Sequence, residues 1–309
     1  MSLVANVEKI SSNYSELSDL LWVALDRDIQ LPKTLDSLGV ISYRGTLNGD
    51  LSNMLSEGMI LSNMGTLNVS VAMNSQDLQL NSYTVEGKVN TKDCHLNKVF
   101  GDASHLGNVA FNAEIILHKL SDRNFRLKAQ GAVDSFYYKN YCYENIRLDG
   151  NFDNSGFDGK LIMSDPNAEL SFLGKADLRK ENPLYHFSSN VRDFNLTKTH
   201  LLEGVDDTHL SFDVETNFVG NNLDELEGSF SLDNVIFAQG EKELGMNNLS
   251  ISATVLPGEN KKLSVYSDYI NGYIKGKYAL TTLPAFFYNI AHQYLPAIVK
   301  DEKMAKQEA

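Results

Sequence analysis

The chain has 309 residues, with 40 acidic and 27 basic residues and a formal net charge of −13. This acidic balance, without a cluster of lysine or arginine, excludes attraction to nucleic acid or to an anionic membrane surface as the basis of function. The length fits one long all-β domain or about two average domains. Cys94 and Cys142 are too far apart in sequence for a metal-binding or redox motif, and the sequence leaves open whether they pair.

The N-terminal segment has helical periodicity. An amphipathic helix over residues 6–28 is predicted by apolar residues at Val7, Ile10, Tyr14, Leu17, Leu20, Leu21 and Ala24. The opening MSLVANVEKI lacks the basic end and apolar run of a secretion signal. No run in the chain approaches the roughly 20 apolar residues needed to cross a bilayer. We therefore expect an excerpt from a longer protein whose membrane anchor lies outside it.

The period changes to two in the middle of the chain. Apolar and polar residues alternate over 67–73, 109–117, 170–178 and 210–218, which predicts strands with one wet face. Short turn-forming groups such as Asp165-Pro166-Asn167 separate them, which favours antiparallel hairpins over helical crossovers.

The end of the chain returns to a helical spacing. Apolar residues within 284–303 predict a second helix, which Pro296 would kink or break. We therefore expect an all-β fold, a curled antiparallel sheet forming an elongated apolar groove with a helix at each end. The expected organisation is an amphipathic helix at 1–30, a continuous β groove at 31–282, and a helix with a polar tail at 283–309.

Glycine occurs where the strands would place apolar side chains. Eleven of the 21 glycines have apolar residues at both i−2 and i+2, against about four expected by chance. A glycine inside a strand lowers the stability of the fold by about 0.5 to 1 kcal/mol relative to alanine. The excess of glycines at these positions therefore needs a physical explanation. Two explanations stay open: the glycines mark bends where the sheet curls, or they leave room along an apolar wall for a long apolar ligand.

The predicted groove lining combines the apolar residues of the alternating segments with the glycines between them. It consists of Val85, Gly87, Val89, Phe111, Ala113, Leu148, Gly150, Phe152, Phe157, Gly159, Leu161, Leu170, Phe172, Gly174, Ala176, Phe212, Val214, Gly228 and Phe230.

A family resemblance rests on the order of several short motifs. The stretch Tyr143-Glu-Asn-Ile146-Arg-Leu148-Asp-Gly150, followed by Phe157-Asp-Gly159, Asp165-Pro166-Asn167 and Phe172-Leu-Gly174, resembles the repeats of the translocation and assembly module family TamB, within the AsmA-like group. The Bacteroidetes-type members are the most similar, and the resemblance covers residues 35–300.

The resemblance implies a function and a location. Members of this group are anchored in the inner membrane, extend through the periplasm toward an outer-membrane barrel of the Omp85 type, and form β grooves implicated in phospholipid transport and outer-membrane assembly. This chain would be an internal periplasmic section, with phospholipid acyl chains in its groove. The barrel partner would be met through regions outside the chain.

The sequence contains no pattern that points to catalysis or metal binding. Its seven histidines are scattered, without an HExxH arrangement, and phosphate loops and GxSxG elbows are missing. The acidic pairs Asp206-Asp207 and Asp224-Glu225 fall in predicted turns, where solvated charge is favoured over calcium or acid–base chemistry. The aromatic residues from Phe136 to Tyr143 predict a strand covered on one side. We expect a protein that is not an enzyme and has no cofactor.

One rival hypothesis remains from the sequence. The chain could be a scaffold that docks outer-membrane proteins by β-augmentation at a sheet edge, without lipid transport. This rival predicts a core filled by its own side chains, with glycines only at bends.

Overall fold

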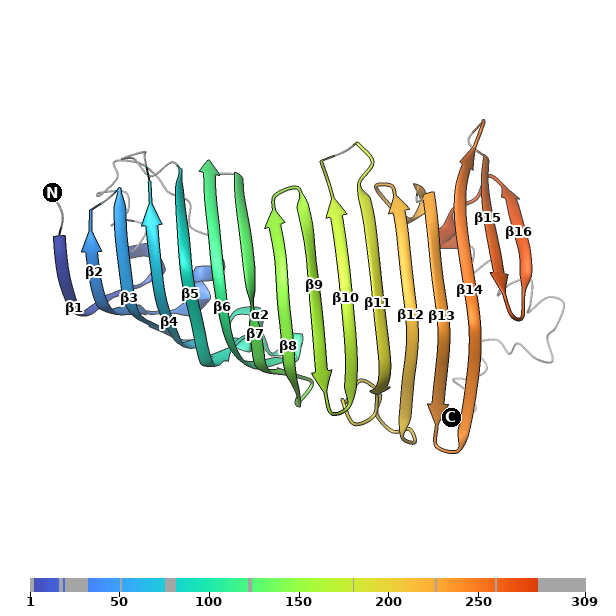
Figure 1. Ribbon diagram of the computed structural model, residues 1–309, viewed down its shortest axis with the longest axis horizontal. Coiled ribbons are helices and arrows are strands. Elements are labelled where there is room, and N and C mark those ends of the chain that lie inside the picture. The colour runs from blue at the N-terminus through green and yellow to red at the C-terminus, as the bar shows by residue number, and fades with distance from the viewer. Residues whose placement is uncertain are drawn as a thin grey trace.

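The computed structural model describes residues 3–16, 19, 33–50, 52–75, 82–121, 124–179, 181–225, 227–258 and 260–282. Its strands form one antiparallel sheet of 16 strands, each paired with its neighbours in chain order (Figure 1). The strands are β1 (Leu3–Ser12), β2 (Ile41–Gly49), β3 (Asn53–Ser62), β4 (Gly65–Asn74), β5 (Tyr83–His95), β6 (Leu106–Ser121), β7 (Asn124–Tyr138), β8 (Tyr141–Asp153), β9 (Gly156–Asp165), β10 (Ala168–Asp177), β11 (Leu184–Asn195), β12 (Thr208–Val219), β13 (Glu227–Gln239), β14 (Lys242–Leu256), β15 (Asn260–Ser267) and β16 (Asn271–Gly276).

The predicted all-β fold is confirmed. The four alternating segments fall on β4, β6, β10 and β12. The described residues form only short helical segments. The labelled segments are η1 (Lys33–Leu38), α2 (Asn97–Phe100), η2 (Asp102–Ser104), η3 (Leu223–Glu225) and η4 (Leu280–Thr282). None of the helices in the described ranges is long and apolar enough to span a membrane.

The helix predicted at the N-terminus is wrong for residues 6–12. These residues lie in β1, which pairs with β2 from Leu3↔Gly49 to Ser12↔Ile41 and has a bulge between Val7 and Ile10. The ladder that β2 offers at the sheet edge outweighs the helical spacing, because periodicity over so short a segment is a weak preference. The sheet therefore begins at residue 3 and not at residue 31. Residues 14–16 and 19 are helical, and the rest of the predicted helix lies outside the described residues, as does the helix predicted at 284–303.

Tight turns make the sequential topology. Two-residue turns at 154–155 and 166–167 join β8 to β9 and β9 to β10, so that Asp153 pairs with Gly156 and Asp165 with Ala168. The second turn coincides with the predicted turn-forming group Asp165-Pro166-Asn167. Because each strand pairs with the next strand along the chain, the order of the sheet is the order of the sequence.

The strand pairing places apolar side chains on one face of the whole sheet. One row of paired positions crosses all sixteen strands and is apolar or glycine at every position except Ser56 and Thr216. The row is Ala5, Leu47, Ser56, Val71, Gly87, Ile115, Ala129, Gly150, Gly159, Gly174, Phe187, Thr216, Phe230, Ile251, Val265 and Gly272.

The adjacent row, one residue along each strand, lies on the opposite face and is almost entirely polar. Across the middle of the sheet it consists of Glu57, Ser70, Lys88, Glu114, Gln130, Asp149, Lys160, Leu173, Ser188, Glu215 and Ser231. Since side chains alternate between faces along a strand, the sheet has one apolar face and, along this row from β3 to β13, a mostly polar opposite face.

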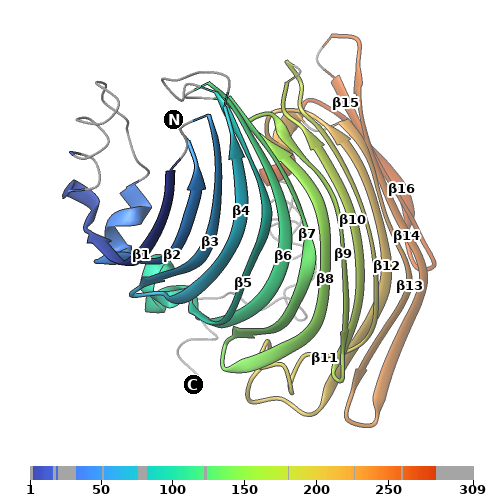
Figure 2. The same ribbon diagram turned by 60° about the vertical axis from the view of Figure 1, so that its left-hand side comes forward.

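The sheet is curved into an open trough. Figure 2 shows that the strands bend along their length, so that the long axis of the trough crosses the strands. The apolar face lies on the concave side, where Tyr141 and Tyr143 contact His200 and Thr199 of the β11–β12 connection that turns into the hollow. With strands about 4.8 Å apart, sixteen strands span about 70 Å. The trough is therefore long enough along its axis to accommodate extended apolar chains.

Candidate functional site

All nineteen residues predicted to line a groove lie on the concave apolar face. Their paired positions place them there: Gly87, Gly150, Gly159, Gly174 and Phe230 belong to the central row, and the others lie two or four residues from it along their strands. Because alternate residues of each strand point to the same face, the sheet brings together side chains that are far apart in sequence.

The concave wall is partly accessible. Each of the nineteen residues is buried or half-buried, whereas their outward neighbours Glu86, Lys88, Glu114, Lys160 and Lys175 are exposed. The concave side chains crowd one another because the strands bend toward them. Most of them nevertheless keep part of their surface open to the hollow.

Three glycines of the predicted lining, Gly87, Gly159 and Gly228, do not leave empty space. A Cβ added at Gly87 would lie 2.7 Å from Val71 Cα on the next strand, and one at Gly159 would lie 3.1 Å from Gly150 Cα. A Cβ at Gly228 would lie 3.0 Å from Phe218 Cα. At Gly87 and Gly228 a Cβ would also meet a backbone carbonyl oxygen of the next strand at a distance that side chains do not tolerate, and at Gly159 the fit would be tight. These glycines therefore allow neighbouring backbones to approach where the sheet bends.

Phenylalanine rings occupy the space above the other two glycines of the predicted wall. A Cβ at Gly150 would lie 3.0 Å from the Phe152 ring, and one at Gly174 would lie 2.6 Å from the Phe172 ring and 3.0 Å from the Phe157 ring. The prediction that glycines leave free room is therefore wrong at these positions. Open space is found at the last strand, where a Cβ at Gly272 would meet nothing within 4 Å.

An aromatic stack strengthens the middle of the wall. The Phe187 ring is stacked with the rings of Phe157 and Phe172, with centroid distances of 5.9 Å in both pairs. Aromatic pairs of this kind contribute about 0.5 to 1.5 kcal/mol beyond area burial. Phe187 was not among the predicted lining residues, because Ser189 interrupts the apolar alternation of β11. Its only sequence signal is the short pair Tyr185 and Phe187.

A hydrophobic cluster lies where the strands end at one rim of the trough. We call Tyr141, Tyr143, Ile146, Met163 and Ala168 the rim cluster; all of them except Tyr141 are at most 9% exposed. This region includes the predicted aromatic segment: Tyr141 and Tyr143 lie on the concave face and make an edge-on contact at 4.8 Å. Tyr137 on the outer face is 41% exposed. The prediction of a single aromatic strand is wrong, because the aromatic residues belong to β7 and β8, which a turn at 139–140 joins. Coverage of these residues on one side is as predicted.

A buried carboxylate organises the rim cluster. Tyr141 Oη donates to Asp165 Oδ1 at 2.5 Å and accepts a hydrogen bond from Asn167 Nδ2 at 2.9 Å, while the Glu144 N–H donates to Asp165 Oδ2 at 3.0 Å. Burial and the hydrogen bond to Asp165 raise the pKa of Tyr141 to about 12. The group thus fixes the β9–β10 turn against β8 and is a structural element of the rim.

The connection between β11 and β12 crosses this rim. We call residues 196–207 the strap. His200 Nδ1 lies 2.9 Å from the Lys139 carbonyl oxygen of the β7–β8 turn, and the N–H of Asn195, just before the strap, donates to the Asn167 carbonyl at 2.8 Å. The strap therefore reaches from β11 back over β10 and β9 to β8, and it covers the rim cluster.

The outer face carries the charged contacts. Arg192 Nη2 binds both carboxylate oxygens of Asp213, at 2.7 and 2.9 Å. Hydrogen bonding from Asn234, together with Arg192, lowers the pKa of Asp213. Three hollows of about 420, 280 and 330 Å³ are lined by charged and polar residues of this face together with apolar residues, such as Leu127 and Phe152 in the first. The Arg192–Asp213 pair thus lies on the face opposite the central row of the apolar wall.

Among the residues that the structure describes, no group of three or more histidine, cysteine, aspartate or glutamate side chains is arranged to hold a metal ion. Cys94 and Cys142 are both free thiols. The acidic pairs lie in connections as predicted: Asp206 and Asp207 in the strap, and Asp224 and Glu225 in η3.

In comparisons with known proteins, no protein-family model, no curated protein and no solved structure matches this chain. The concave apolar wall is therefore the feature from which a function has to be argued.

Proposed function

We propose that this chain is a periplasmic section of a conduit that carries phospholipids between the inner and outer membranes of a cell envelope. The observation that carries the proposal is the single apolar wall that runs across sixteen strands on the concave face. The motif resemblance to TamB-like proteins supports the same function and the same location. In this proposal the membrane anchor and the contacts with an Omp85-type barrel belong to regions outside the chain.

The energetics suit a lipid tail. Burial of one methylene contributes about 0.8 kcal/mol, so an acyl chain of about 16 carbons lying in an apolar trough gains on the order of 10 kcal/mol. Such binding requires no polar recognition motif. The central row of the wall, and the positions two residues from it along each strand, carry no charged side chain. Such a surface avoids deep local wells, which would stop onward movement of the lipid.

The close contacts at the glycines determine where a lipid tail could lie in the trough. Space for the tail comes from the curvature of the sheet and not from missing side chains, because the space above the predicted lining glycines is taken by backbone and by phenylalanine rings. The tail would therefore lie on the surface of half-buried side chains such as Val214 and Leu148.

Two adjacent residues of β10 provide the test. Phe172 lies on the concave face, and Leu173 lies on the outer face with 50% exposure, between Lys160 and Ser188. A photo-crosslinking amino acid at Phe172 should label phospholipid several-fold more than one at Leu173, and solvent extraction of the purified protein should release phospholipid that mass spectrometry identifies. Equal labelling at both positions, or an extract without phospholipid, would contradict the proposal.

The two free sheet edges favour a second candidate. Within the described part of the chain, β1 and β16 each pair with one neighbour only, and an unpaired edge is a template for another strand. A scaffold that docks other proteins at these edges would yield no phospholipid on extraction. The same experiment therefore distinguishes the two functions.

A further inference from the structure

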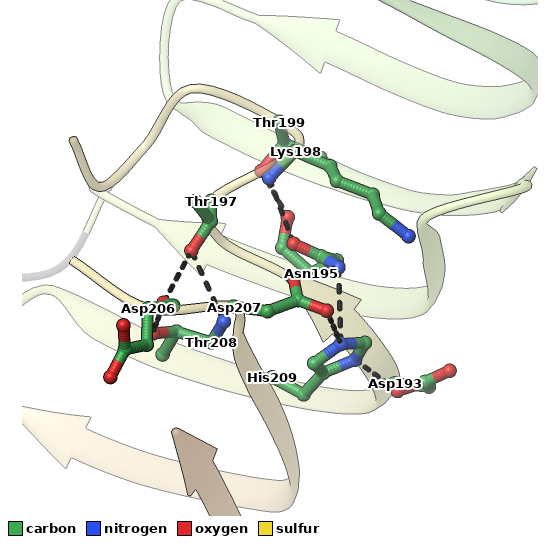
Figure 3. Close-up of polar contacts among 9 residues, drawn as sticks. All are labelled: Asp193, Asn195, Thr197, Lys198, Thr199, Asp206, Asp207, Thr208 and His209. Carbon is green, nitrogen blue, oxygen red and sulfur yellow. Dashed lines mark hydrogen bonds and ion pairs between the residues drawn. The ribbon is translucent and has the colours of Figure 1, made fainter. Parts of the chain in front are cut away.

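A histidine at the start of β12 lies between two carboxylates (Figure 3). His209 Nδ1 is 2.6 Å from Asp193 Oδ1, and His209 Nε2 is 3.2 Å from Asp207 Oδ2. Asp193 lies at the bulge of β11, where its backbone has φ of 45°, and Asp207 is the last residue of the strap. His209 therefore connects the sheet to the strap.

A buried amide fixes the geometry around the imidazole. Asn195 is 1% exposed; its Oδ1 accepts the Lys198 N–H at 2.8 Å, which directs its Nδ2 toward Asp207 Oδ1 at 2.8 Å and His209 Nε2 at 3.1 Å. The Asn195 carbonyl also accepts the Thr199 N–H at 3.1 Å and the Thr199 hydroxyl at 2.7 Å. One side of the strap is thus anchored on Asn195.

The two protonation states of His209 differ in what they satisfy. In the neutral ring with the proton on Nδ1, Nε2 is an acceptor and can receive a hydrogen bond from Asn195 Nδ2. It then has no proton to donate to the Asp207 carboxylate, which also faces it. In the imidazolium, Nδ1–H donates to Asp193 and Nε2–H donates to Asp207, while Asn195 still donates to Asp207. Only the protonated ring joins both carboxylates.

The charges around the ring favour that state. Asp193 faces it from β11, and Asp207 faces it from the strap, with Lys198 acting on Asp207 from the same segment. On the other side, the register partner of His209 on β13 is the uncharged Ala238.

We propose that protonation of His209 latches the strap onto the sheet by joining Asp193 to Asp207, and that deprotonation loosens the strap and uncovers the rim cluster at the edge of the trough. The strap closes over Tyr143, which is hydrogen-bonded to Thr199, and over Tyr141, which contacts the His200 ring at 6.3 Å. Loosening it would expose apolar surface continuous with the concave wall. The latch stands on this geometry whether or not the trough carries lipid.

The direction of the pH dependence follows from the pKa values. Burial lowers the pKa of His209, but hydrogen bonds from the ring to Asp193 and Asp207 outweigh it and raise the pKa above its ordinary value of 6.5. The latch is therefore complete below pH 6.5 and is lost as the pH rises through the folded pKa. The pKa of Asp207 is lowered, by Asn195 first and then by His209, so this carboxylate stays charged in mild acid.

Hydrogen exchange across pH 5.5 to 9 tests the latch. The reporters are the Lys198 and Thr199 amides, both bonded to Asn195, with rates corrected for the intrinsic effect of pH. Because exposed ion pairs contribute little, we expect exchange about two- to fivefold faster above the His209 titration than below it. The variant His209→Gln should show the faster exchange at every pH. The control His186→Gln, on the outer face of β11 opposite Lys175 and Asn217, should behave as wild type.

Two further measurements test the latch without the His209→Gln variant, in case that variant fails to fold. The NMR titration of the wild-type His209 ring should have its midpoint above 6.5, and Asp193→Asn, whose side chain is 83% exposed in the parent, should lower that midpoint. A midpoint at or below 6.5, or exchange of the strap amides that does not follow the His209 titration, would overturn the latch.

Discussion

Two glycines of the concave face, Gly131 and Gly272, should differ in how substitution by alanine changes the stability of the protein. Gly131 lies on the concave face of β7, paired with Ala113 and Leu148. A Cβ at Gly131 would contact the Asn112 carbonyl oxygen and lie 2.7 Å from Ala113 Cα and 2.9 Å from Ala113 Cβ. A Cβ at Gly272, on the same face of β16, would meet nothing within 4 Å. The two glycines therefore differ in surroundings while sharing the same face of the sheet.

The magnitudes follow from this difference. Gly272→Ala should leave the free energy of unfolding unchanged or raise it by up to about 1 kcal/mol, because alanine restricts the unfolded chain. Gly131→Ala gains the same term but forces the β6 and β7 backbones apart, and overpacking of this kind costs about 1 to 3 kcal/mol. Gly131→Ala should therefore be the less stable variant by about 2 kcal/mol.

Urea denaturation followed by far-UV circular dichroism measures the difference, with equal m-values as the sign that the folded states are comparable. The double variant Gly131→Ala/Ala113→Gly should recover only part of the loss, because it removes the Cβ–Cβ contact and leaves the contacts with backbone. If Gly131→Ala is as stable as Gly272→Ala, then the close approach of strands does not explain the glycines.

Three further predictions concern the rim, the outer face and the wall. Tyr141→Phe should lower the free energy of unfolding by about 1 to 3 kcal/mol, because it removes the hydroxyl donor from the buried Asp165 and leaves this carboxylate with only the N–H groups of Glu144 and Asn167. Tyr273→Phe, at a residue that is 69% exposed, should have little effect. Since the pKa of Tyr141 is raised from 10.0 to about 12, its contribution should be intact below pH 10 and be lost as the pH rises toward 12; a stability that is flat over this range would contradict the assignment. Asp213→Asn should be less stable than wild type at neutral pH, and the difference should vanish as the pH falls through the lowered pKa of Asp213, which urea denaturation at several pH values measures. Val214→Glu should reduce the phospholipid extracted per mole of protein, whereas Leu173→Glu on the outer face should not; equal loss in both variants would separate lipid binding from the concave wall.

Substitution of leucine for a wall glycine is not a clean test of a lipid groove. Replacing Gly150 or Gly174 by leucine would seem to test a blocked groove. A Cβ at Gly174 would lie 2.6 Å from the Phe172 ring, so that substitution would disturb the aromatic stack before it blocked anything. Charges introduced at Val214 and Leu173 test the trough without touching the glycines.

Much of the fold is written in the sequence itself. Period-two alternation along β4, β6, β10 and β12, with turn residues between the strands, determines an antiparallel sheet with one apolar face. Since consecutive strands pair in order, local signals suffice to place Leu148, Leu161 and Phe172 on the same face. The same alternation places charged residues such as Lys88, Glu114 and Lys160 on the other face.

Other features were decided only by tertiary structure. Residues 6–12 have helical spacing but form β1, because the free edge of β2 offers them a ladder of hydrogen bonds. The role of the glycines depended on distances between neighbouring strands, which the spacing of glycine along one strand does not encode. The contact of His209 with Asp193 and Asp207 depends on a bulge in β11 and on the path of the strap. Alternation along a strand is a local property, whereas curvature, edge pairing and the meeting of charged side chains depend on where distant segments come to lie.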